Sequence, residues 1–187
     1  MRRSLSGAAA ASPLERIPNR SLPQEGTPIT VSKKIRIQQL IIERLAADLA
    51  VLSVAAKTAH EASIHEENIP DNKYDTLSLE ASYVAQGQAN RAQELKRALH
   101  GYQTLTLQQF EADAAIRLTA LVTLEAEDGD TRLLFIGPHE GGMKLKVDGA
   151  EVLVITAGSP LGNALIGKCV GDVVDLGKRD FEIVRLC

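Results

Sequence analysis

The fold of this chain is decided by an acidic stretch, residues 66–76, which reads Glu-Glu-Asn-Ile-Pro-Asp-Asn-Lys-Tyr-Asp-Thr. It separates two long segments in which apolar residues follow a heptad pattern. Pro70 lies inside the stretch, and proline cannot continue a helix and biases the preceding residue away from helical dihedral angles. Two long helices joined by a short polar loop fold back on each other. The sequence therefore predicts an antiparallel helical hairpin with carboxylates at its tip.

The first arm of the hairpin is predicted to start at Ser32, a favourable N-cap residue, and to run through residues 33–68 without a glycine or proline. At about 1.5 Å per residue such a helix is on the order of 50 Å long. Its apolar residues alternate in steps of three and four, as in a coiled coil. This seam consists of Ile42, Leu45, Leu49, Leu52, Ala56 and Ala59.

The second arm has a matching seam of seven positions, one of them polar: Ala81, Ala85, Gln88, Ala92, Leu95, Leu99 and Tyr102. On both arms the large residues lie far from the acidic loop and the alanines lie near it. Small seam residues let two helices approach closely. We therefore expect a rod that is slimmer at its tip, as a rod that enters a narrow opening requires.

The heptads stop near Gly101, and the second half of the chain has the period of a sheet. Strands are expected at residues 116–124, 131–136, 151–156, 173–176 and 181–186, with a turn at 127–130. Ser159 and Pro160 are typical of a helix start, and Gly167 of its end. We predict an α+β protein with three parts: a disordered tail at 1–31, a coiled coil at 32–106 and a small antiparallel sheet domain with one short helix at 107–187.

The composition excludes several classes of function. The net charge of −3 creates no basic field for nucleic acid, and 3% aromatic residues are too few for a base-stacking platform. No apolar run reaches the roughly 18 residues of a membrane span. The two cysteines cannot form a disulfide framework, and the apolar stretch at residues 7–11 is short for a targeting peptide. We expect a cytoplasmic monomer that does not bind membranes.

One motif in the second half resembles a known family. It consists of Ser-Pro-Leu-Gly-Asn-Ala-Leu-Ile-Gly-Lys at residues 159–168, Gly-Asp-Val-Val at 171–174 and Phe-Glu-Ile-Val at 181–184. These segments resemble the C-terminal domain of the bacterial Gre transcription elongation factors (GreA and GreB). A coiled coil followed by this domain is also the Gre arrangement, so the resemblance covers roughly residues 33–187. It implies an FKBP-like fold for the C-terminal part.

The resemblance implies a partner and a site. Gre factors dock on core RNA polymerase with the C-terminal domain and insert the coiled coil into its secondary channel, where they reach the nascent RNA indirectly. By this resemblance the polymerase-binding residues are Ser159, Pro160, Leu161 and Lys168. The resemblance also implies DNA binding as an expectation.

At the tip, the resemblance implies that acidic residues help to hold a Mg²⁺ ion that belongs to the active centre of the polymerase, which then cleaves backtracked RNA. Mg²⁺ prefers carboxylate oxygen and water, and two metal ions can stabilise an in-line displacement. The factor then needs no stably bound cofactor and no catalysis of its own. The candidate tip residues are Asp75 and Glu80, which would be the transient Mg²⁺ ligands, followed by Asp71 and Glu67.

The tip also departs from the family pattern. If Tyr83 is matched to the tyrosine that opens the second helix in the family, then Thr76 and Leu79 occupy the positions of the two family acids. Asp75 and Glu80 are each offset by one residue, which is about 100° around a helix. The alternative to cleavage is therefore a non-cleaving competitor or inhibitor at the same channel, as in Gre homologues and Rnk-type regulators.

Two other classes of function are weaker readings. An FKBP-like fold suggests a peptidyl-prolyl isomerase, but such enzymes line their pocket with several aromatic residues. The second half contains only Phe110, Phe135 and Phe181. A purely structural coiled-coil adaptor is the other reading, and the taper of the rod and its acidic tip argue against it.

Overall fold

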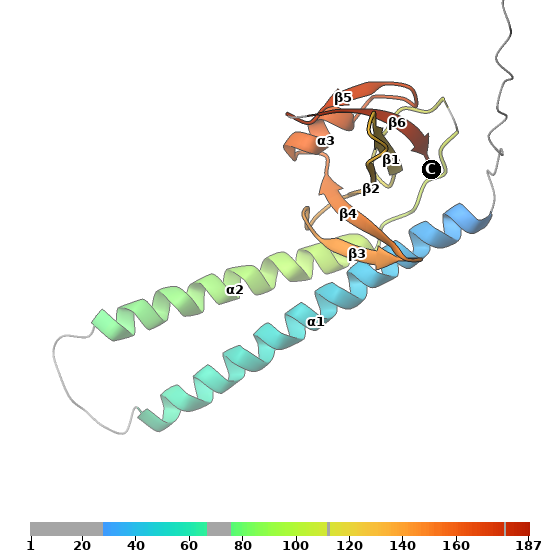
Figure 1. Ribbon diagram of the computed structural model, residues 1–187. Helices are drawn as coiled ribbons and strands as arrows, with labels where there is room; N and C mark the ends of the chain where they lie inside the picture. Colours follow the sequence, from blue (N-terminus) through green and yellow to red (C-terminus); the bar gives the residue numbers. More distant parts are fainter. Residues whose placement is uncertain (1–27, 67–75, 112, 178) are drawn as a thin grey trace, which may run out of the picture.

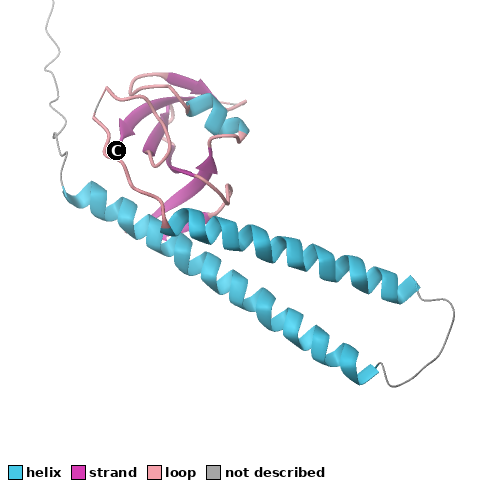
Figure 2. Ribbon diagram, turned by 180° about the vertical axis from the view of Figure 1, so that it is seen from behind, coloured by secondary structure: helices cyan, strands magenta, loops and turns pink. Residues whose placement is uncertain are grey.

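The computed structural model describes residues 28–111, except 67–75, and residues 113–177 and 179–187. Side chains at 28–30, 59–66 and 76–82 lie outside that description. Two long helices, α1 (Pro28–Glu66) and α2 (Thr76–Gln103), form a hairpin that projects from a small sheet domain (Figure 1). The base of the hairpin packs on the sheet, and its other end extends away from it (Figure 2).

Helix α1 begins earlier than the sequence predicts. Its first residue is Pro28, so the prediction that Ser32 is the N-cap is wrong, and Ser32 lies inside the helix. Proline is favoured at the first helical position, because the missing N–H would have no partner there and the ring presets φ. Helix α1 ends at Glu66 and α2 starts at Thr76, which agrees with the boundaries predicted for the loop.

The sheet has six strands in the order β3-β4-β2-β1-β6-β5. The strands are β1 (Leu121–Ala126), β2 (Thr131–Gly137), β3 (Lys144–Val147), β4 (Ala150–Thr156), β5 (Val173–Asp175) and β6 (Asp180–Leu186), and the short helix α3 spans Pro160–Leu165. Helical hairpin, sheet and short helix together confirm the predicted α+β class.

The sheet is mixed, and the prediction of a wholly antiparallel sheet needs this correction. Strands β2 and β4 are parallel, with Leu133 opposite Val152. The cause is the hairpin of β3 and β4: the chain reverses in β3 and again in β4, and β4 rather than β3 pairs with β2. Strand β3 is absent from the sequence prediction, although Lys-Leu-Lys-Val followed by Asp-Gly has the alternation and turn of a hairpin.

The first strand is also shorter at its start than predicted. Strand β1 begins at Leu121 rather than at residue 116. Thr119 has φ of +72°, and this left-handed conformation interrupts an extended chain. Its buried side-chain oxygen accepts a hydrogen bond from the backbone N–H of Gln108 at 3.0 Å, which joins the turn to the segment after α2.

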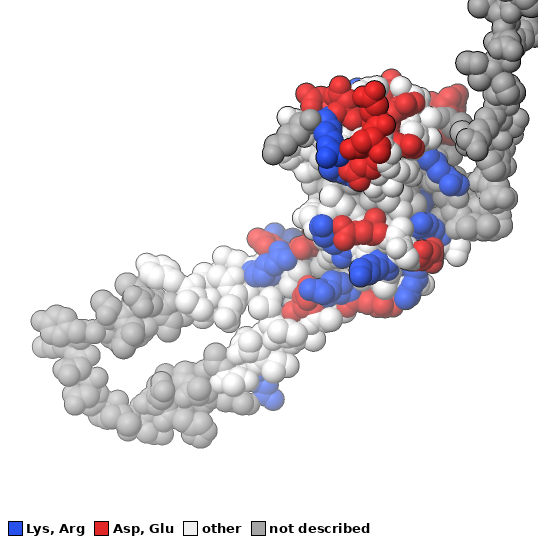
Figure 3. Space-filling view, viewed as in Figure 1, with Lys and Arg blue, Asp and Glu red and all other residues white. Residues whose placement is uncertain are grey.

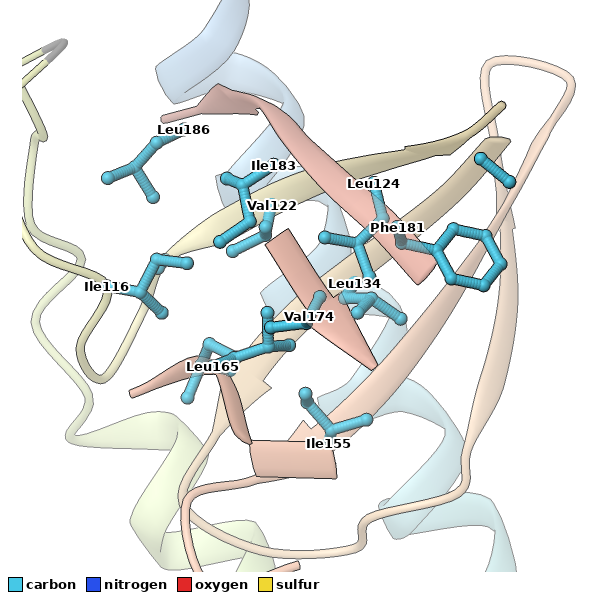
Figure 4. Close-up of a cluster of buried hydrophobic side chains, with 13 residues drawn as sticks. Ile116, Val122, Leu124, Leu134, Ile155, Leu165, Val174, Phe181, Ile183 and Leu186 are labelled. Atoms are coloured by element: carbon cyan, nitrogen blue, oxygen red, sulfur yellow. The ribbon is translucent and has the colours of Figure 1, made fainter. Parts of the chain in front are cut away.

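Side chains that alternate along the strands build two cores, one on each face of the sheet. The first core lies under α3 and contains Val122, Leu134 and Ile155 among its buried residues (Figure 4). The second core lies between the sheet and the base of the hairpin. Its buried members are Ile37, Ile41, Leu45, Leu95, Ala98, Tyr102, Leu121, Phe135, Val147, Val152 and Val154. The hairpin base therefore belongs to the core of the sheet domain.

The seam of the hairpin is packed at the base and open further out. Leu45 and Leu95 are buried, and Leu49, Leu52 and Leu99 are half-buried. The alanines at 55, 56, 85 and 89 are exposed, and the arms diverge in both views (Figures 1 and 2). The expectation that alanines bring the arms close together near the tip is wrong for these residues, because methyl groups bury too little apolar area to hold the helices.

Candidate functional site

The structure places the predicted tip residues outside its description. Glu67, Asp71 and Asp75 fall in the segment 67–75, and Glu80 lies in α2 but its side chain is outside the described residues. Their roles at the tip therefore stay predictions. The structure does describe the contact between the base of the hairpin and the sheet, which we call the joint, and the surface around α3.

The start of α3 is a tightly built cap. The Ser159 hydroxyl donates to the carbonyl oxygen of Thr156 at 2.7 Å and accepts a hydrogen bond from the Gly162 N–H at 3.0 Å. Pro160 occupies the first turn, as the sequence predicts. A Cβ added to Gly162 would lie 2.0 Å from the Thr156 oxygen, so only glycine fits there. Ser159 thus has a structural role inside the loop, with both functions of its hydroxyl occupied.

The remaining predicted binding residues lie on the same face but differ in exposure. Pro160 is exposed, Leu161 is half-buried against the first core, and Lys168 is half-buried. The Lys168 Nζ donates to the carbonyl oxygen of Val173 at 3.1 Å, which joins the segment after α3 to β5. The backbone N–H of Ile116 donates a hydrogen bond to the carbonyl oxygen of Lys168 at 2.8 Å.

Three apolar side chains flank Lys168 that the sequence prediction missed. Ile166, Val170 and Val173 are exposed although they are large and hydrophobic. A signal was present in the sequence, since apolar residues surround a lysine at the end of a very short helix, where few of them can be buried. A group of large exposed apolar side chains is typical of a protein-binding surface.

The joint between hairpin and sheet is made by Tyr102 at the end of α2. Its ring is fully buried in the second core, and its hydroxyl donates to the carbonyl oxygen of His139 at 2.7 Å. Burial raises the pKa of Tyr102 above its ordinary value. Gln38 of α1 completes the joint, because its Nε2 donates to the carbonyl oxygens of Tyr102 at 2.7 Å and Leu105 at 2.9 Å, at the end of α2 where helical partners run out.

Lys34 forms a second polar contact at the hairpin base. This lysine is buried, and its Nζ donates to the carbonyl oxygens of Gln108 and Cys187, the latter at 3.2 Å. It also lies 4.7 Å from the centre of the Phe110 ring. Burial lowers the pKa of Lys34 to about 8; the charge of Cys187 opposes this shift, and the Arg117 guanidinium adds to it. The amine ties α1 to both ends of the sheet domain.

On the surface, the Arg91 guanidinium of α2 braces the loop after β2. It donates to both carboxylate oxygens of Glu140, at 3.1 and 2.9 Å, and to Glu94 at 3.2 Å. These contacts raise the pKa of Arg91. Bidentate pairing fixes geometry as well as charge, so the brace holds α2 against the sheet domain further along the hairpin than Tyr102 does.

Charge is unevenly distributed over the molecule (Figure 3). Acidic side chains gather on the sheet domain, where Glu125 is opposite Glu182 and Asp175 is opposite Asp180 on neighbouring strands. Like charges placed opposite each other on neighbouring strands are destabilising, so these two pairs lower the stability of the sheet. The hairpin base carries both signs, and the middle of the hairpin is white in Figure 3.

The aromatic rings of the second half form no isomerase-like pocket. Phe135 is buried in the second core and Phe181 in the first. Phe110 stacks between the cations of Lys34 and Arg117, each 4.7 Å from the ring centre. With all three rings used in packing, the structure offers an isomerase no aromatic lining.

Two further observations concern metals and membranes. Within the described residues, no three His, Cys, Asp or Glu side chains gather in a group that could hold a metal ion. Neither α1 nor α2, the two long helices of the described chain, has an apolar stretch long enough to span a membrane.

Comparison with known proteins gives structural matches alone: no protein-family model and no curated protein matches the chain. The chain is similar to GreA factor homolog 1 (Gfh1) of Thermus thermophilus, with 20% identity and a TM-score of 0.33 over 78% of this chain and 94% of the other. Thermus aquaticus Gfh1 matches with 20% identity and a TM-score of 0.31 over 77% and 92%. The GreA/GreB elongation factor of Nitrosomonas europaea matches with 15% identity and a TM-score of 0.32 over 59% and 94%.

Proposed function

We propose that this protein is a bacterial transcription elongation regulator that binds core RNA polymerase and inserts its hairpin into the secondary channel. The observation that carries the proposal is the architecture. A long helical pair is fixed at one end in the core of a sheet domain and is free of that domain over the rest of its length (Figure 1). Such a rod can reach into a partner while the sheet domain stays outside. The protein acts in the cytoplasm as a monomer, and DNA binding is not part of the proposal.

In this mechanism the sheet domain supplies the affinity. The docking face is the region around α3, where Pro160 is exposed beside the apolar side chains of Ile166, Val170 and Val173. Lys168 adds a cation at the same face. Ser159 and Leu161 act indirectly, by capping α3 and by anchoring it to the first core.

The tip supplies the effect on the polymerase. Carboxylate oxygens have the chemistry that Mg²⁺ prefers, so Asp75 and Glu80, with Asp71 and Glu67, have suitable donors for a metal ion shared with the polymerase active centre. The protein contributes no catalytic group of its own and holds no stable cofactor. It alters the metal occupancy of the polymerase or the access of RNA to it.

A second candidate function is a non-cleaving competitor at the same channel. The observation that favours it is the sequence of the tip, where Thr76 and Leu79 occupy the positions of the two acids expected in cleavage factors. A purely structural adaptor is now opposed by the acidic tip alone, because the exposed alanines remove the argument from a slim, closely packed rod.

The deciding experiment follows RNA length in halted, backtracked elongation complexes after the protein is added. Rapid shortening of the RNA that disappears in D75A/E80A supports cleavage. No shortening, together with displacement of an established cleavage factor, supports the competitor. A wild-type protein that fails to bind core polymerase contradicts both versions.

The control is a matched pair of carboxylates far from the tip. Asp113 and Glu127 are exposed and lie in the linker after α2 and in the turn after β1. D113A/E127A removes the same two charges and the same side-chain types as D75A/E80A. It should retain the full wild-type effect on RNA length, which separates a role of the tip from an effect of net charge.

A further inference from the structure

The middle of the hairpin is an uncharged band, which we call the neutral collar: residues 49–56 of α1 and 83–90 of α2. Neither segment contains Asp, Glu, Lys or Arg. Charged residues adjoin both segments on the side of the base, at Asp48 and Arg91. The collar is the white zone beyond the charged base in Figure 3.

The two segments lie at the same level of the hairpin. Leu45 of α1 and Leu95 of α2 are buried in the same core. In an antiparallel pair, four to eleven residues outward from Leu45 lie 49–56, and five to twelve residues outward from Leu95 lie 83–90. Because both helices rise about 1.5 Å per residue, the two segments are at the same level to within about one residue. The absence of charge is therefore a property of one cross-section of the rod.

The collar exposes large apolar side chains. Val51 is 68% exposed, Val54 65%, Tyr83 69% and Val84 60%. The outward face of a hairpin in water is normally polar, and a helix that is apolar all round is normally buried. Segment 49–56 has one polar residue, Ser53, whereas 83–90 also contains Gln86, Gln88 and Asn90. Large apolar side chains exposed at one level of the hairpin are typical of a surface that a partner covers.

Three of these four side chains, those of Val51, Val54 and Tyr83, do not belong to the contact between the arms. Val84 lies about 20° around α2 from Leu95 and therefore faces the other arm. At 100° per residue, Val51 and Val54 lie about 130° and about 170° around α1 from the mean direction of the seam residues Leu45, Leu49 and Leu52. Tyr83 lies on the corresponding outer side of α2. Ala50, Val51, Val54 and Ala55 instead line an open apolar depression on α1. Closing the arms on each other would leave this outer surface in water.

We propose that the neutral collar is a contact surface for an apolar, uncharged protein wall that surrounds the hairpin, and that this wall belongs to the RNA polymerase channel of the proposed function. The inference rests on that function and adds which part of the hairpin the polymerase contacts. Apolar side chains on the outer sides of both arms fit a partner that encloses the rod.

A second copy of this chain fits the collar less well. The three large side chains that face outward offer on the order of 300 Å² of apolar surface. A stable interface buries about 800 Å² on each partner. Two collars side by side would also cover only one side of each hairpin and leave the other side in water.

The test uses the full-length protein and core RNA polymerase of the source organism, with binding measured by fluorescence anisotropy of labelled protein. V51K/V54K places two charges on the collar and V51A/V54A removes apolar area. Both changes preserve or improve helix propensity, so the helix should stay formed, which circular dichroism checks. A47K is the control: Ala47 is exposed on the same side of α1, outside the collar and beside Asp48.

The expected result is at least tenfold weaker binding for V51K/V54K, severalfold weaker binding for V51A/V54A and unchanged binding for A47K, because charge in an apolar contact is costly. If both double variants bind polymerase as tightly as the wild type does, the collar is not a contact surface, and the proposed function is left intact. A wild type that does not bind polymerase overturns both. Sedimentation could instead show that the wild type and A47K are dimers and that V51K/V54K is a monomer. The partner of the collar would then be a second copy of the chain, and the inference would be overturned.

Discussion

Replacing Gly137 by alanine should destabilise the contact between hairpin and sheet, and removing the Tyr102 hydroxyl as well should add less than its own cost, because it relieves part of the clash. Gly137 ends β2 beneath the Tyr102 ring. A Cβ at this position would lie 2.1 Å from the Tyr102 hydroxyl oxygen, where real side chains are never found. The ring must therefore move, and its hydrogen bond to the His139 oxygen is lost. Gly137 has no positive φ, so the alanine tests the clash rather than the backbone.

The structure sets the size of the effect. Overpacking a core costs about 1–3 kcal/mol, and losing a buried hydrogen bond costs about 1 kcal/mol, so G137A should lower the free energy of unfolding by about 2–4 kcal/mol. Y102F leaves one carbonyl without its donor and should cost about 1–2 kcal/mol. In the double variant the nearest atoms are the ring Cζ at 3.1 Å and Val154 Cγ1 at 3.2 Å, which need to give way by only a few tenths of an ångström.

The double variant should therefore cost about 2–3 kcal/mol, at least 1 kcal/mol less than the sum of the single changes. Urea unfolding followed by circular dichroism at 222 nm measures all four proteins. Gly87 in α2 supplies the control, since a Cβ there meets nothing within 4 Å. G87A should stabilise the protein by up to about 1 kcal/mol and be additive with Y102F. Additive costs for G137A and Y102F would show that the two groups do not meet as described.

Two more predictions concern single residues at the base and beside α3. Burial lowers the pKa of Lys34 to about 8 from 10.5, so the folded state binds fewer protons than the unfolded state between these values, and the free energy of unfolding should rise by about 1–3 kcal/mol from pH 8 to pH 10. In the K34M variant this rise in the free energy of unfolding should be absent. Above pH 10 the raised pKa of buried Tyr102 lowers the free energy of unfolding of both proteins as the pH rises. G162A, which forces a Cβ to 2.0 Å from the Thr156 oxygen, should cost about 2–4 kcal/mol in thermal or urea unfolding, and a loss below 1 kcal/mol would contradict the close packing of α3.

Sequence patterns predict those parts of the fold that local chemistry decides. The heptads and Pro70 locate both arms of the hairpin, and Ser159 with Pro160 locates the start of α3 to the residue, although α3 ends at Leu165, before the predicted end at Gly167. The parallel pairing of β2 with β4 has no local signal, because it depends on which of two strands in a hairpin meets a third. The open arms are missed for a related reason. A heptad pattern reports which residues could form a seam, whereas the area buried decides whether they do.

The candidate site divides in the same way. The carboxylates of the tip and the motif around Lys168 are visible in the sequence as charge and spacing. The apolar group beside Lys168 emerges only when the short length of α3 leaves Ile166 and Val170 uncovered. Lys34 could not be found at all, since a lysine at a helix start is normally solvated, and its burial follows from the packing of α1 on segments more than 70 residues away.

The division between a packed base and an open middle means that the base alone sets the direction of the hairpin. Helix α1 continues from buried Leu45 to Glu66, which is roughly 30 Å at about 1.5 Å per residue. A rotation of about 5° at the base therefore displaces the end of α1 by roughly 3 Å, comparable with the length of a metal–ligand contact. The contacts at Tyr102, Gln38 and Arg91 resist such a rotation because they involve both helices and two places along α2, residues 91 and 102. A hairpin whose seam is weak can in this way still keep a fixed direction relative to the sheet, because these contacts bind its base.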